Sequence, residues 1–379
     1  MNKIIMVSQA NGGVSVYLKN FIRYLDTTKF EVELILSKQF ESEIAEYKEL
    51  NCIIHFVDMA RNFDIKKDLK AARAIRKIIK KKNPQVVYAH SSKAGFLTRV
   101  AISTKTTPIM YNSHGWAFNM NTGGFKKRVY TFAEKILSFN TSKIITISEF
   151  EKERALNRRV CKERDLILIK NGIDLNIINF QEKIIENKKK MLNLFCIPVD
   201  AIIIGQVGRL DEQKNPHLFV EIAKELNNYN SNIYFFLVGD GKLRKAVEAQ
   251  IEQYNLKEKF IITGWVSNVI EYINLFDVCI LTSQWEGFGL VLAEYMIAKK
   301  PVVASDVGGI PNVVQHNKTG ILCDRNDKME FVTAIKTIIQ DERIVRKFSK
   351  NGFEAAKIKF SFERVMNEHY DLLFKILKN

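Results

Sequence analysis

Apolar strand patterns and amphipathic helix patterns alternate along this chain in two successive series, which constrains its fold more than any other feature. Alternation of this kind predicts parallel strands joined by helical crossovers. The first series has strand patterns at Ile4–Val7, Val32–Leu36, Ile53–Phe56, Val86–Ala89, Ile109–Tyr111 and Ile144–Ile147. The second has them at Ala201–Val207, Ile233–Val238, Phe260–Ile262, Val278–Leu281 and Pro301–Ala304. Helical periodicity is clearest at Val14–Leu25, Ile65–Lys82 and Phe125–Phe139. We therefore expect an α/β protein of two tandem doubly wound domains.

The boundary between the domains is predicted at an Asn-Gly turn, Asn171-Gly172, which follows the apolar run Leu166–Ile169. A polar segment, Gln181–Lys190, precedes the second series. A chain of 379 residues is long enough for two cores. The domains are thus expected at residues 1–171 and 172–358. In such a pair, the ligand is expected in a cleft at the carboxyl ends of both sheets.

Composition excludes several classes of protein. No apolar run approaches the ~18 residues of a membrane-spanning helix. The N-terminal stretch Lys3–Ser8 is too short for the core of a signal peptide and is predicted to be the first strand. The five cysteines are scattered without a Cys-x-x-Cys pair, which is typical of a reducing cytosol. A soluble, cytoplasmic protein is expected.

The net charge of +16 is concentrated in the first half of the chain. Residues 1–171 hold 31 Lys and Arg against 16 Asp and Glu, whereas residues 172–379 hold 27 against 26. Such asymmetry indicates that one lobe faces an anionic surface, either lipid or nucleic acid. Ile65–Lys82 is predicted to be a basic crossover helix. Its inward stripe is expected to consist of Leu69, Ala72, Ile75 and Ile79. An alternative interpretation is a membrane-surface patch that also includes Lys126-Lys127-Arg128 and Arg158-Arg159.

The stretch Ser283–Glu294 is the strongest candidate for a ligand site. It follows a buried strand and opens a helix, and its glycines Gly287 and Gly289 leave backbone N–H groups uncovered at the helix start. Such a start favours a phosphate group. Glu286 and Glu294 lie on either side of it, and carboxylates are suited to accept hydrogen bonds from paired sugar hydroxyls.

Basic and glycine-bearing turns follow other strands. Arg209 and Lys214, in the loop after the first strand of the second series, are predicted to hold a diphosphate. Gly12-Gly13 follows the first strand of the chain, but the sequence lacks Gly-x-Gly-x-x-Gly and an acidic residue after the second strand. A nicotinamide oxidoreductase is therefore disfavoured.

Two histidines follow neighbouring strands of the first series. His90 ends one strand, and His114, followed by Gly115, comes just after the next. Both are expected at the edge that faces the ligand. A histidine in such a place is as often structural as functional, and we favour a functional role for His114. No His/Cys cluster or Asp-x-Asp indicates a metal.

Taken together, these motifs resemble those of the family-four retaining GT-B glycosyltransferases. The resemblance covers the C-terminal lobe in order: Gly208-Arg209-Leu210 with Lys214, Gly239-Asp240-Gly241 with Leu243, Gly264-Trp265-Val266, Glu286-Gly287-Phe288-Gly289 with Glu294, and Pro301–Gly309. The N-terminal lobe matches more loosely, through Gly12-Gly13 and His114-Gly115. The resemblance also implies that the C-terminal segment, residues 359–379, is a helix that crosses back to the first domain.

The resemblance implies a role for each matching residue. Arg209 and Lys214 would bind the donor diphosphate and stabilise the leaving group, and Glu286 would contact the donor sugar. Backbone N–H groups near Gly289 and Leu290 would meet the phosphates, and Glu294 would hold the ribose. His114 would lie near the reacting sugar, so the catalytic residues implied are His114, Glu286, Arg209 and Lys214. The base would lie by Leu243, Trp265 and Val266, and the remaining donor contacts would be Gly12, Gly13, Gly239, Gly287 and Phe288. The family needs no metal or other cofactor and retains the anomeric configuration of the sugar.

Further residues bear on the substrates. His90–Gly95 with His114–Phe118 looks like enzymes that build bacterial capsule or exopolysaccharide, whose acceptors are commonly sugars on polyprenyl diphosphate at the inner leaflet. This implies a UDP-sugar donor, a saccharide or lipid-linked acceptor, and an anionic membrane against the basic lobe. Asn215, Asn312 and Ser15 depart from the residues common in the family, which leaves the sugar specificity open.

Two other classes of function remain as alternatives. The first is a nucleotide-sugar epimerase or a phosphorylase of the same fold, although the Glu-x7-Glu spacing fits neither well. The second is a nucleic-acid-binding protein, which the basic half would favour. No basic strand interleaved with aromatic residues and no known binding motif accompanies that charge, so specific nucleic-acid binding is not expected.

Overall fold

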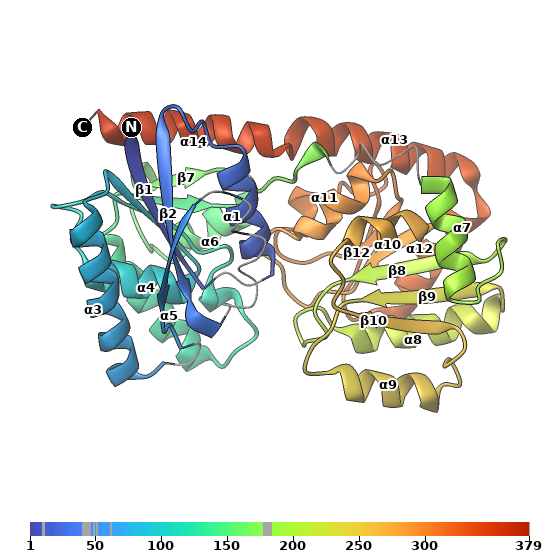
Figure 1. Cartoon of the computed structure of the whole chain (residues 1–379). Helices are drawn as coiled ribbons and strands as arrows, with labels where there is room; N and C mark the ends of the chain where they lie inside the picture. The colour runs from blue at the N-terminus through green and yellow to red at the C-terminus, as the bar shows by residue number, and fades with distance from the viewer. Residues whose placement is uncertain are drawn as a thin grey trace. The chain divides into compact units, whose positions relative to one another are not determined.

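The computed structural model describes the chain except residues 10–11, 40–46, 48–49, 51, 61–62, 177–183 and 379, and it describes residues 184–187 without their side chains. The chain divides into two compact units (Figure 1). One consists of Met1–Ile173 together with Phe362–Asn379, and the other of Asp174–Ser361. Each unit has its own parallel sheet and its own hydrophobic core.

The first unit is built on a seven-stranded parallel sheet in the order β3-β2-β1-β4-β5-β6-β7. Its strands are β1 (Asn2–Ser8), β2 (Phe30–Ser37), β3 (Ile53–Val57), β4 (Val86–His90), β5 (Ile109–Asn112), β6 (Lys143–Thr146) and β7 (Leu166–Leu168). The helical segments are α1 (Gly13–Arg23), α3 (Ile65–Lys82), α4 (Ser92–Ala101), η2 (Ala117–Asn119), α5 (Gly124–Ser138), α6 (Glu149–Asn157), η3 (Glu163–Asp165) and α14 (Phe362–Leu377). Because β1 and β4 are not consecutive, the strand order reverses between them.

The second unit has a six-stranded parallel sheet in the order β10-β9-β8-β11-β12-β13. Its strands are β8 (Ile202–Val207), β9 (Ile233–Val238), β10 (Phe260–Gly264), β11 (Val278–Leu281), β12 (Val302–Ser305) and β13 (Ile321–Cys323). The helical segments are α7 (Ile184–Leu194), α8 (Pro216–Tyr229), α9 (Arg244–Gln253), α10 (Val269–Leu275), α11 (Leu290–Ile297), η5 (Ile310–Asn312), α12 (Lys328–Gln340) and α13 (Glu342–Lys359). Here the order reverses between β8 and β11.

The reversal points determine where a ligand can approach each sheet. Neighbouring loops diverge at such a point, and ligands of open parallel sheets bind outside the carboxyl ends of the strands there. In the first unit these loops follow β1 and β4, and therefore contain Gly12-Gly13 and the region after His90. In the second unit they follow β8 and β11, and therefore contain Arg209, Lys214 and Glu286.

The predicted α/β architecture of two doubly wound sheets is confirmed, and the C-terminal helix α14 belongs to the first unit. Its apolar residues Phe362, Val365 and Met366 share a core with Leu18 and Phe21 of α1. In Figure 1 the helix is the red segment that carries the C-terminus. Two short strands, β7 and β13, were not predicted, because each has only three residues and shows no alternation to detect.

One detail of the basic helix α3 was predicted wrongly. Ala72, Ile75 and Ile79 are buried as expected, but Leu69 is exposed. Asp68 is turned inward instead, where it accepts a hydrogen bond of 2.6 Å from the ammonium of Lys93 on α4. Asp68, rather than Leu69, therefore continues the buried face formed by Ala72, Ile75 and Ile79.

Candidate active site

The loops after β8 and β11 are joined by an ion pair between Lys214 and Glu286. The Lys214 ammonium contacts Oε1 of Glu286, and the hydroxyl of Ser283 donates to the same oxygen at 3.1 Å. The side chains are 15% and 8% exposed, so both charges lie largely out of water. A cation and a carboxylate that share a partly dry site can each bind one end of a phosphorylated sugar.

Arg209 lies in the same loop as Lys214 and is held by two neighbours. Its guanidinium pairs with Asp211 at 3.2 Å and donates to Oε1 of Gln213 at 3.0 Å. Gln213 in turn donates from Nε2 to the carbonyl of Trp285 at 3.2 Å, and the amide of Gln284 donates to the Gln213 carbonyl at 2.7 Å. Gln213 therefore links the basic loop after β8 to the acidic loop after β11. The sequence offers no signal for this role.

Helix α11 begins beside this ion pair without a side-chain cap. Its N-cap, Gly289, has a φ of 81°, in the left-handed region that favours glycine. Backbone amides and the positive end of the helix dipole thus point out of the helix start, next to Lys214 and Glu286. This geometry is suited to an anion.

Glu294 lies one to two turns into α11 and is only partly exposed. Burial raises the pKa of its carboxyl to about 7, and the Lys214 ammonium opposes this rise. The carboxyl is therefore close to half ionised at neutral pH. A group in this state can accept or donate hydrogen bonds to paired hydroxyls.

Glycines allow the loops of the second unit to pack backbone against backbone. A Cβ on Gly308 would lie 2.1 Å from the Glu286 carbonyl oxygen, and one on Gly309 would lie 2.0 Å from that of Gly287. The Gly309 amide donates to the Glu286 carbonyl at 3.0 Å. The turn after β12 thus supports the Glu286 loop from behind.

A second close backbone contact involves Gly239, another predicted donor residue of this unit. A Cβ on Gly239 would lie 2.1 Å from the Gly208 carbonyl oxygen, and Gly239 also forms a bridge with Gly264. Trp265, which follows Gly264, is 68% exposed and available to a ligand, whereas Phe288 is buried against Phe360. The predicted residues Leu243 and Val266 are partly buried.

In the first unit, His90 and His114 form a pair at the ends of β4 and β5. Nδ1 of His90 lies 2.9 Å from Nε2 of His114. The backbone of His114 has a φ of 53° and that of Ser91 a φ of 73°, which is uncommon for residues other than glycine and is often found at functional sites. The His114 amide donates to Oδ1 of Asn112 at 2.9 Å, which helps to hold this turn.

Both histidines are neutral at physiological pH. The pKa of His114 is lowered to about 3, mainly by burial and in smaller part by nearby His369. Burial likewise brings the pKa of His90 well below its usual range, and His114 and His369 contribute to this shift. His114, which is partly exposed, can therefore exchange hydrogen bonds with a ligand, whereas His90 is fully buried, and neither supplies a positive charge.

A buried polar cluster packs behind the histidine pair. Nδ1 of His369, on α14, contacts the Val365 carbonyl at 2.7 Å, so this nitrogen carries the hydrogen. Its Nε2 is therefore the acceptor, and the hydroxyls of Tyr17 and Tyr88 each lie 3.0 Å from it. The Tyr17 ring meets the His114 ring edge-on at 4.8 Å. None of these three partners was predicted, and His369 lies too far along the chain for sequence spacing to reveal it.

Gly12 and Gly13, the predicted phosphate contacts of the first unit, lie at the start of α1. Gly12 has a φ of 54°, and a Cβ built at either glycine would meet nothing within 4 Å. Their backbone is thus open to a ligand. Ser15, which stands where the family often has Glu, is buried with its hydroxyl 2.8 Å from that of Tyr47.

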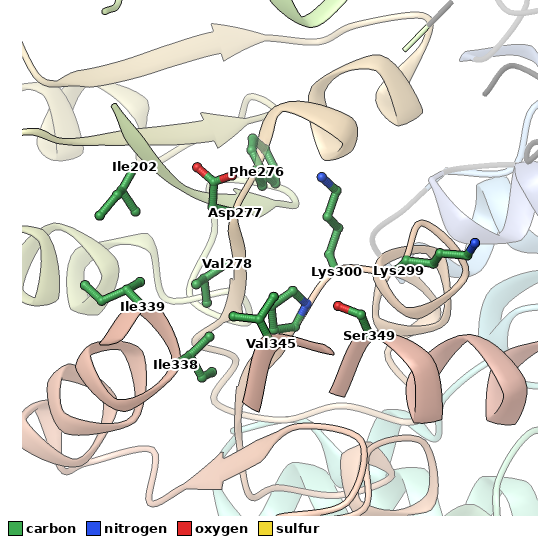
Figure 2. A pocket seen from close by; sticks show the side chains of 11 residues that line it. Ile202, Phe276, Asp277, Val278, Lys299, Lys300, Ile338, Ile339, Val345 and Ser349 are labelled. Atoms are coloured by element: carbon green, nitrogen blue, oxygen red, sulfur yellow. The ribbon is translucent and has the colours of Figure 1, made fainter. Parts of the chain in front are cut away.

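The predicted residues of each unit thus lie in loops and first helical turns that follow its strands. None of the predicted site residues lines the cavity of about 300 Å³ in the second unit (Figure 2). It is lined by Ile202, Val278 and Pro301, which lie at the amino ends of their strands.

The described side chains contain no cluster of three or more His, Cys, Asp and Glu arranged for a metal ion. No described helix has both the length and the apolar character that a bilayer span requires.

Comparison with known proteins gives relatives along almost the whole chain. An *Escherichia coli* protein described as UDP-Gal:alpha-D-GlcNAc-diphosphoundecaprenol alpha-1,3-galactosyltransferase is 28% identical over 376 residues, which is 97% of this chain and 95% of that protein. The *Staphylococcus aureus* capsular polysaccharide biosynthesis glycosyltransferase CapM is 25% identical, over 95% of this chain and 94% of its own.

Solved structures agree with the fold. *Anabaena* Alr3699/HepE in complex with UDP and glucose superposes with a TM-score of 0.83 at 19% identity, covering 99% of this chain and all of its own. The models of two protein families match consecutive parts of the sequence. Glycosyltransferase Family 4 matches residues 11–177, and Glycosyl transferases group 1 matches residues 187–355. Glycosyltransferase family models thus match both units of the structure, and the chain belongs to the glycosyltransferases with the GT-B fold.

Proposed function

We propose that this protein transfers a hexose from a UDP-sugar, with retention of anomeric configuration, to a saccharide acceptor carried on polyprenyl diphosphate. The product would enter a bacterial surface polysaccharide such as capsule, exopolysaccharide or O-antigen. The *E. coli* relative, by its description, uses UDP-galactose and a diphosphoundecaprenol-linked sugar, and CapM is described as a capsular enzyme. Both relatives align over almost the full length of this chain.

The observation that carries the donor side of the proposal is the cluster at the start of α11. Lys214 and Arg209 provide cations, α11 provides an uncapped helix start, and Glu286 and Glu294 provide carboxylates. We assign the diphosphate to Arg209, Lys214 and the amides of Gly289 and Leu290. Glu286 then contacts the transferred sugar, and Glu294 the ribose.

Charge development in the reaction explains why cations stand at this place. As the bond between the sugar and the diphosphate breaks, negative charge grows on the leaving phosphate oxygen. Fixed cations and helix amides stabilise that charge most where water is excluded. We infer that Arg209 and Lys214 perform this task without a metal ion, while neutral His114 donates a hydrogen bond to the sugar.

The donor assignment is tested by thermal unfolding with UDP, GDP, ADP and CMP, each with and without EDTA. A ligand at 100 times its dissociation constant adds about 2.7 kcal/mol of stability. We expect UDP to stabilise the protein and the other three nucleotides not to. EDTA should leave the effect of UDP unchanged, and Glu294→Ala should abolish it. Glu354→Ala, which removes an exposed carboxylate of the same unit, is the matched control.

The reaction itself is tested with a purified polyprenyl-diphosphate-linked sugar and labelled UDP-hexoses. The proposal expects transfer to the lipid-linked acceptor and an α-linkage from an α-linked donor by NMR. Inversion of the linkage would refute the retaining mechanism. Conversion of the UDP-sugar without acceptor would instead indicate an epimerase, and stabilisation by GDP would move the donor to a guanosine sugar.

We also propose that the protein works at the inner face of the cell membrane, since its acceptor is expected there. The strongly basic first half of the chain supports this, because residues 1–171 carry a net charge of +15. Basic side chains near an anionic leaflet contribute about 1 kcal/mol each to membrane binding.

A further inference from the structure

Helix α5 exposes the apolar side of its amphipathic sequence. Five apolar residues recur at intervals of four and three along the helix and its C-cap: Phe125, Val129, Phe132, Ile136 and Phe139. At 3.6 residues per turn, this spacing places all five on one face. All five are exposed, with Phe125 at 80%, Phe132 at 65% and Phe139 at 83%. Scattered exposed apolar residues are ordinary, but a contiguous stripe of large ones marks an interaction surface.

The opposite side of α5 carries a buried carboxylate, that of Glu134. Glu134 is buried, and its carboxylate accepts hydrogen bonds of 2.9 Å from both the Arg99 guanidinium and the Tyr111 hydroxyl. Arg99 is itself buried, with its guanidinium 3.8 Å from the centre of the Tyr111 ring. Turning the helix to bury its apolar stripe would break this buried ion pair, which is costly. The outward direction of the stripe is therefore built into the unit.

Basic side chains accompany the apolar stripe. Lys126, Arg128 and Lys135 of α5 are all exposed. Helix α4 packs against both α5 and the basic helix α3. The exposed basic residues of α3 are Lys66, Lys67, Lys70, Arg73, Arg76, Lys77, Lys80 and Lys81. An apolar helix face with Lys and Arg beside it is the pattern of a helix that lies in the plane of a membrane surface.

Charge decides between a lipid surface and a second copy of the chain. A symmetric dimer through this face would bring the basic residues of both α5 helices together, and like charges in such an interface are unfavourable. An anionic bilayer offers the complement to both features, since its headgroups attract the cations and its acyl region accepts the aromatic rings. We propose that α5 is the membrane-docking helix of this protein, with its Phe125–Phe139 face inserted at the interface of an anionic leaflet.

This inference rests on the proposed function, because a lipid-linked acceptor gives the docking its purpose. Helix α5 follows β5 through the turn that contains His114. Its N-terminal end therefore lies at the same carboxyl edge of the sheet as the histidine pair. Docking through α5 would bring this edge to the level of the headgroups, where the diphosphate and sugar of a polyprenyl-linked acceptor lie.

The test is co-sedimentation with vesicles of phosphatidylglycerol and phosphatidylcholine in equal parts, and with phosphatidylcholine alone. We expect the wild type to bind the anionic vesicles, and the double variant Phe125→Ser/Phe132→Ser to bind them at least about tenfold more weakly, as the loss of one to two buried aromatic side chains predicts. Ile358→Ser, at a residue of the second unit that is 70% exposed, is the matched control and should bind as the wild type does.

A charge-reversed variant, Lys126→Glu/Arg128→Glu/Lys135→Glu, should lose its preference for anionic over neutral vesicles. Thermal stabilisation by UDP, which needs no lipid, is measured on every variant. If UDP stabilises the wild type and the serine variant equally while only the wild type binds vesicles, docking and donor binding are separate and both stand. If vesicle binding changes as expected but UDP has no effect, the proposed donor is wrong and the docking helix stands.

Two results would overturn the docking helix. One is equal vesicle binding by the wild type and the serine variant, or no binding by either. The other is a concentration-dependent dimer of the wild type that Phe125→Ser/Phe132→Ser disperses, without vesicle binding. That outcome, read by size-exclusion chromatography with light scattering, would assign the stripe to self-association.

Discussion

The Nδ1 atom of His90 lies 2.9 Å from Nε2 of His114, and the second nitrogen of His90 is buried without a hydrogen-bond partner among the described residues. A buried N–H without a partner is rarer in proteins than an unpaired acceptor. We infer that His90 carries its hydrogen on Nδ1 and donates it to His114. This arrangement would leave the hydrogen of neutral His114 on Nδ1, where it can be donated to a ligand.

Replacing His90 should therefore disturb His114 without removing it. We expect His90→Leu to lower kcat up to about tenfold with little change in KM for the donor, because an orienting hydrogen bond is worth about 0.5–1.5 kcal/mol. His90→Asn can donate an amide hydrogen from nearly the same position and should retain most of the activity. The tautomer of His114, read from ¹⁵N chemical shifts, should change in the Leu variant only. An unchanged tautomer in both variants would show that His90 merely fills space.

The raised pKa of Glu294 predicts a pH-dependent affinity for the donor. With a pKa of about 7, the carboxyl becomes protonated as the pH falls to 5 and loses its strength as an acceptor for ribose hydroxyls. The affinity for UDP-glucose, whose diphosphate stays fully ionised in this range, should fall about tenfold between pH 8 and pH 5. Isothermal titration calorimetry on the wild type and on Glu294→Gln measures this, and the variant should bind weakly at every pH.

Glu151 provides the control for this prediction. Burial raises its pKa to about 7 as well, but it lies in the first unit and accepts hydrogen bonds from the Trp116 amide and from Asn119. Because the folded state binds the proton more tightly than the unfolded state at both sites, the contribution of each carboxyl to stability should decline as the pH rises from about 4.5 to about 7, while the buried histidines contribute in the opposite direction. Glu151→Gln should therefore gain stability relative to the wild type over this pH range in thermal unfolding, and should leave the pH dependence of donor binding intact.

The ion pair of Lys214 and Glu286 predicts strong coupling between two substitutions. Each of Lys214→Met and Glu286→Gln should lower the free energy of unfolding by about 1–3 kcal/mol, because the remaining partner is left largely buried and unpaired. The double variant should cost less than the sum, with a coupling energy of about 0.5–3 kcal/mol. Urea unfolding of the four proteins measures this quantity.

A second cycle, on Lys242→Met and Glu212→Gln, provides the comparison. That pair is 66% and 58% exposed, and exposed pairs contribute between nothing and about 1 kcal/mol. Near-additive effects are expected there. If the Lys214 cycle were equally additive, the pair would not be a cooperative part of the donor site.

The close backbone contact at Gly309 predicts sensitivity to a single methyl group. In Gly309→Ala the new Cβ would start 2.0 Å from the Gly287 carbonyl oxygen, so the Glu286 loop must move. We expect a loss of about 1–3 kcal/mol in stability, together with at least tenfold weaker binding of UDP-glucose. Gly124→Ala meets nothing within 4 Å and should be neutral or slightly stabilising. Unchanged binding by Gly309→Ala would separate this turn from the site.

Parts of the site could be predicted from the sequence because they are local. Arg209, Lys214, Glu286 and Glu294 lie in short loops or first helical turns directly after apolar strands, and in a parallel sheet such loops meet at one edge. Gln213 and His369 were not predictable in the same way. Their roles depend on which loop or helix packs beside them, and His369 reaches Tyr17 across a separation of 352 residues.

The two doubly wound sheets were predictable from the amino-acid pattern, since strands buried on both faces are apolar runs and the helices between them keep their period. The sequence also indicated which loops carry the charges that suit a diphosphate sugar. The direction in which each helix face points depended instead on packing between elements. Leu69 and the stripe from Phe125 to Phe139 have the spacing of core residues, yet they face outward because Asp68 and Glu134 are paired inside. The periodicity of a sequence shows that a helix has two faces. Which face is buried depends on the side chains that it meets on neighbouring elements.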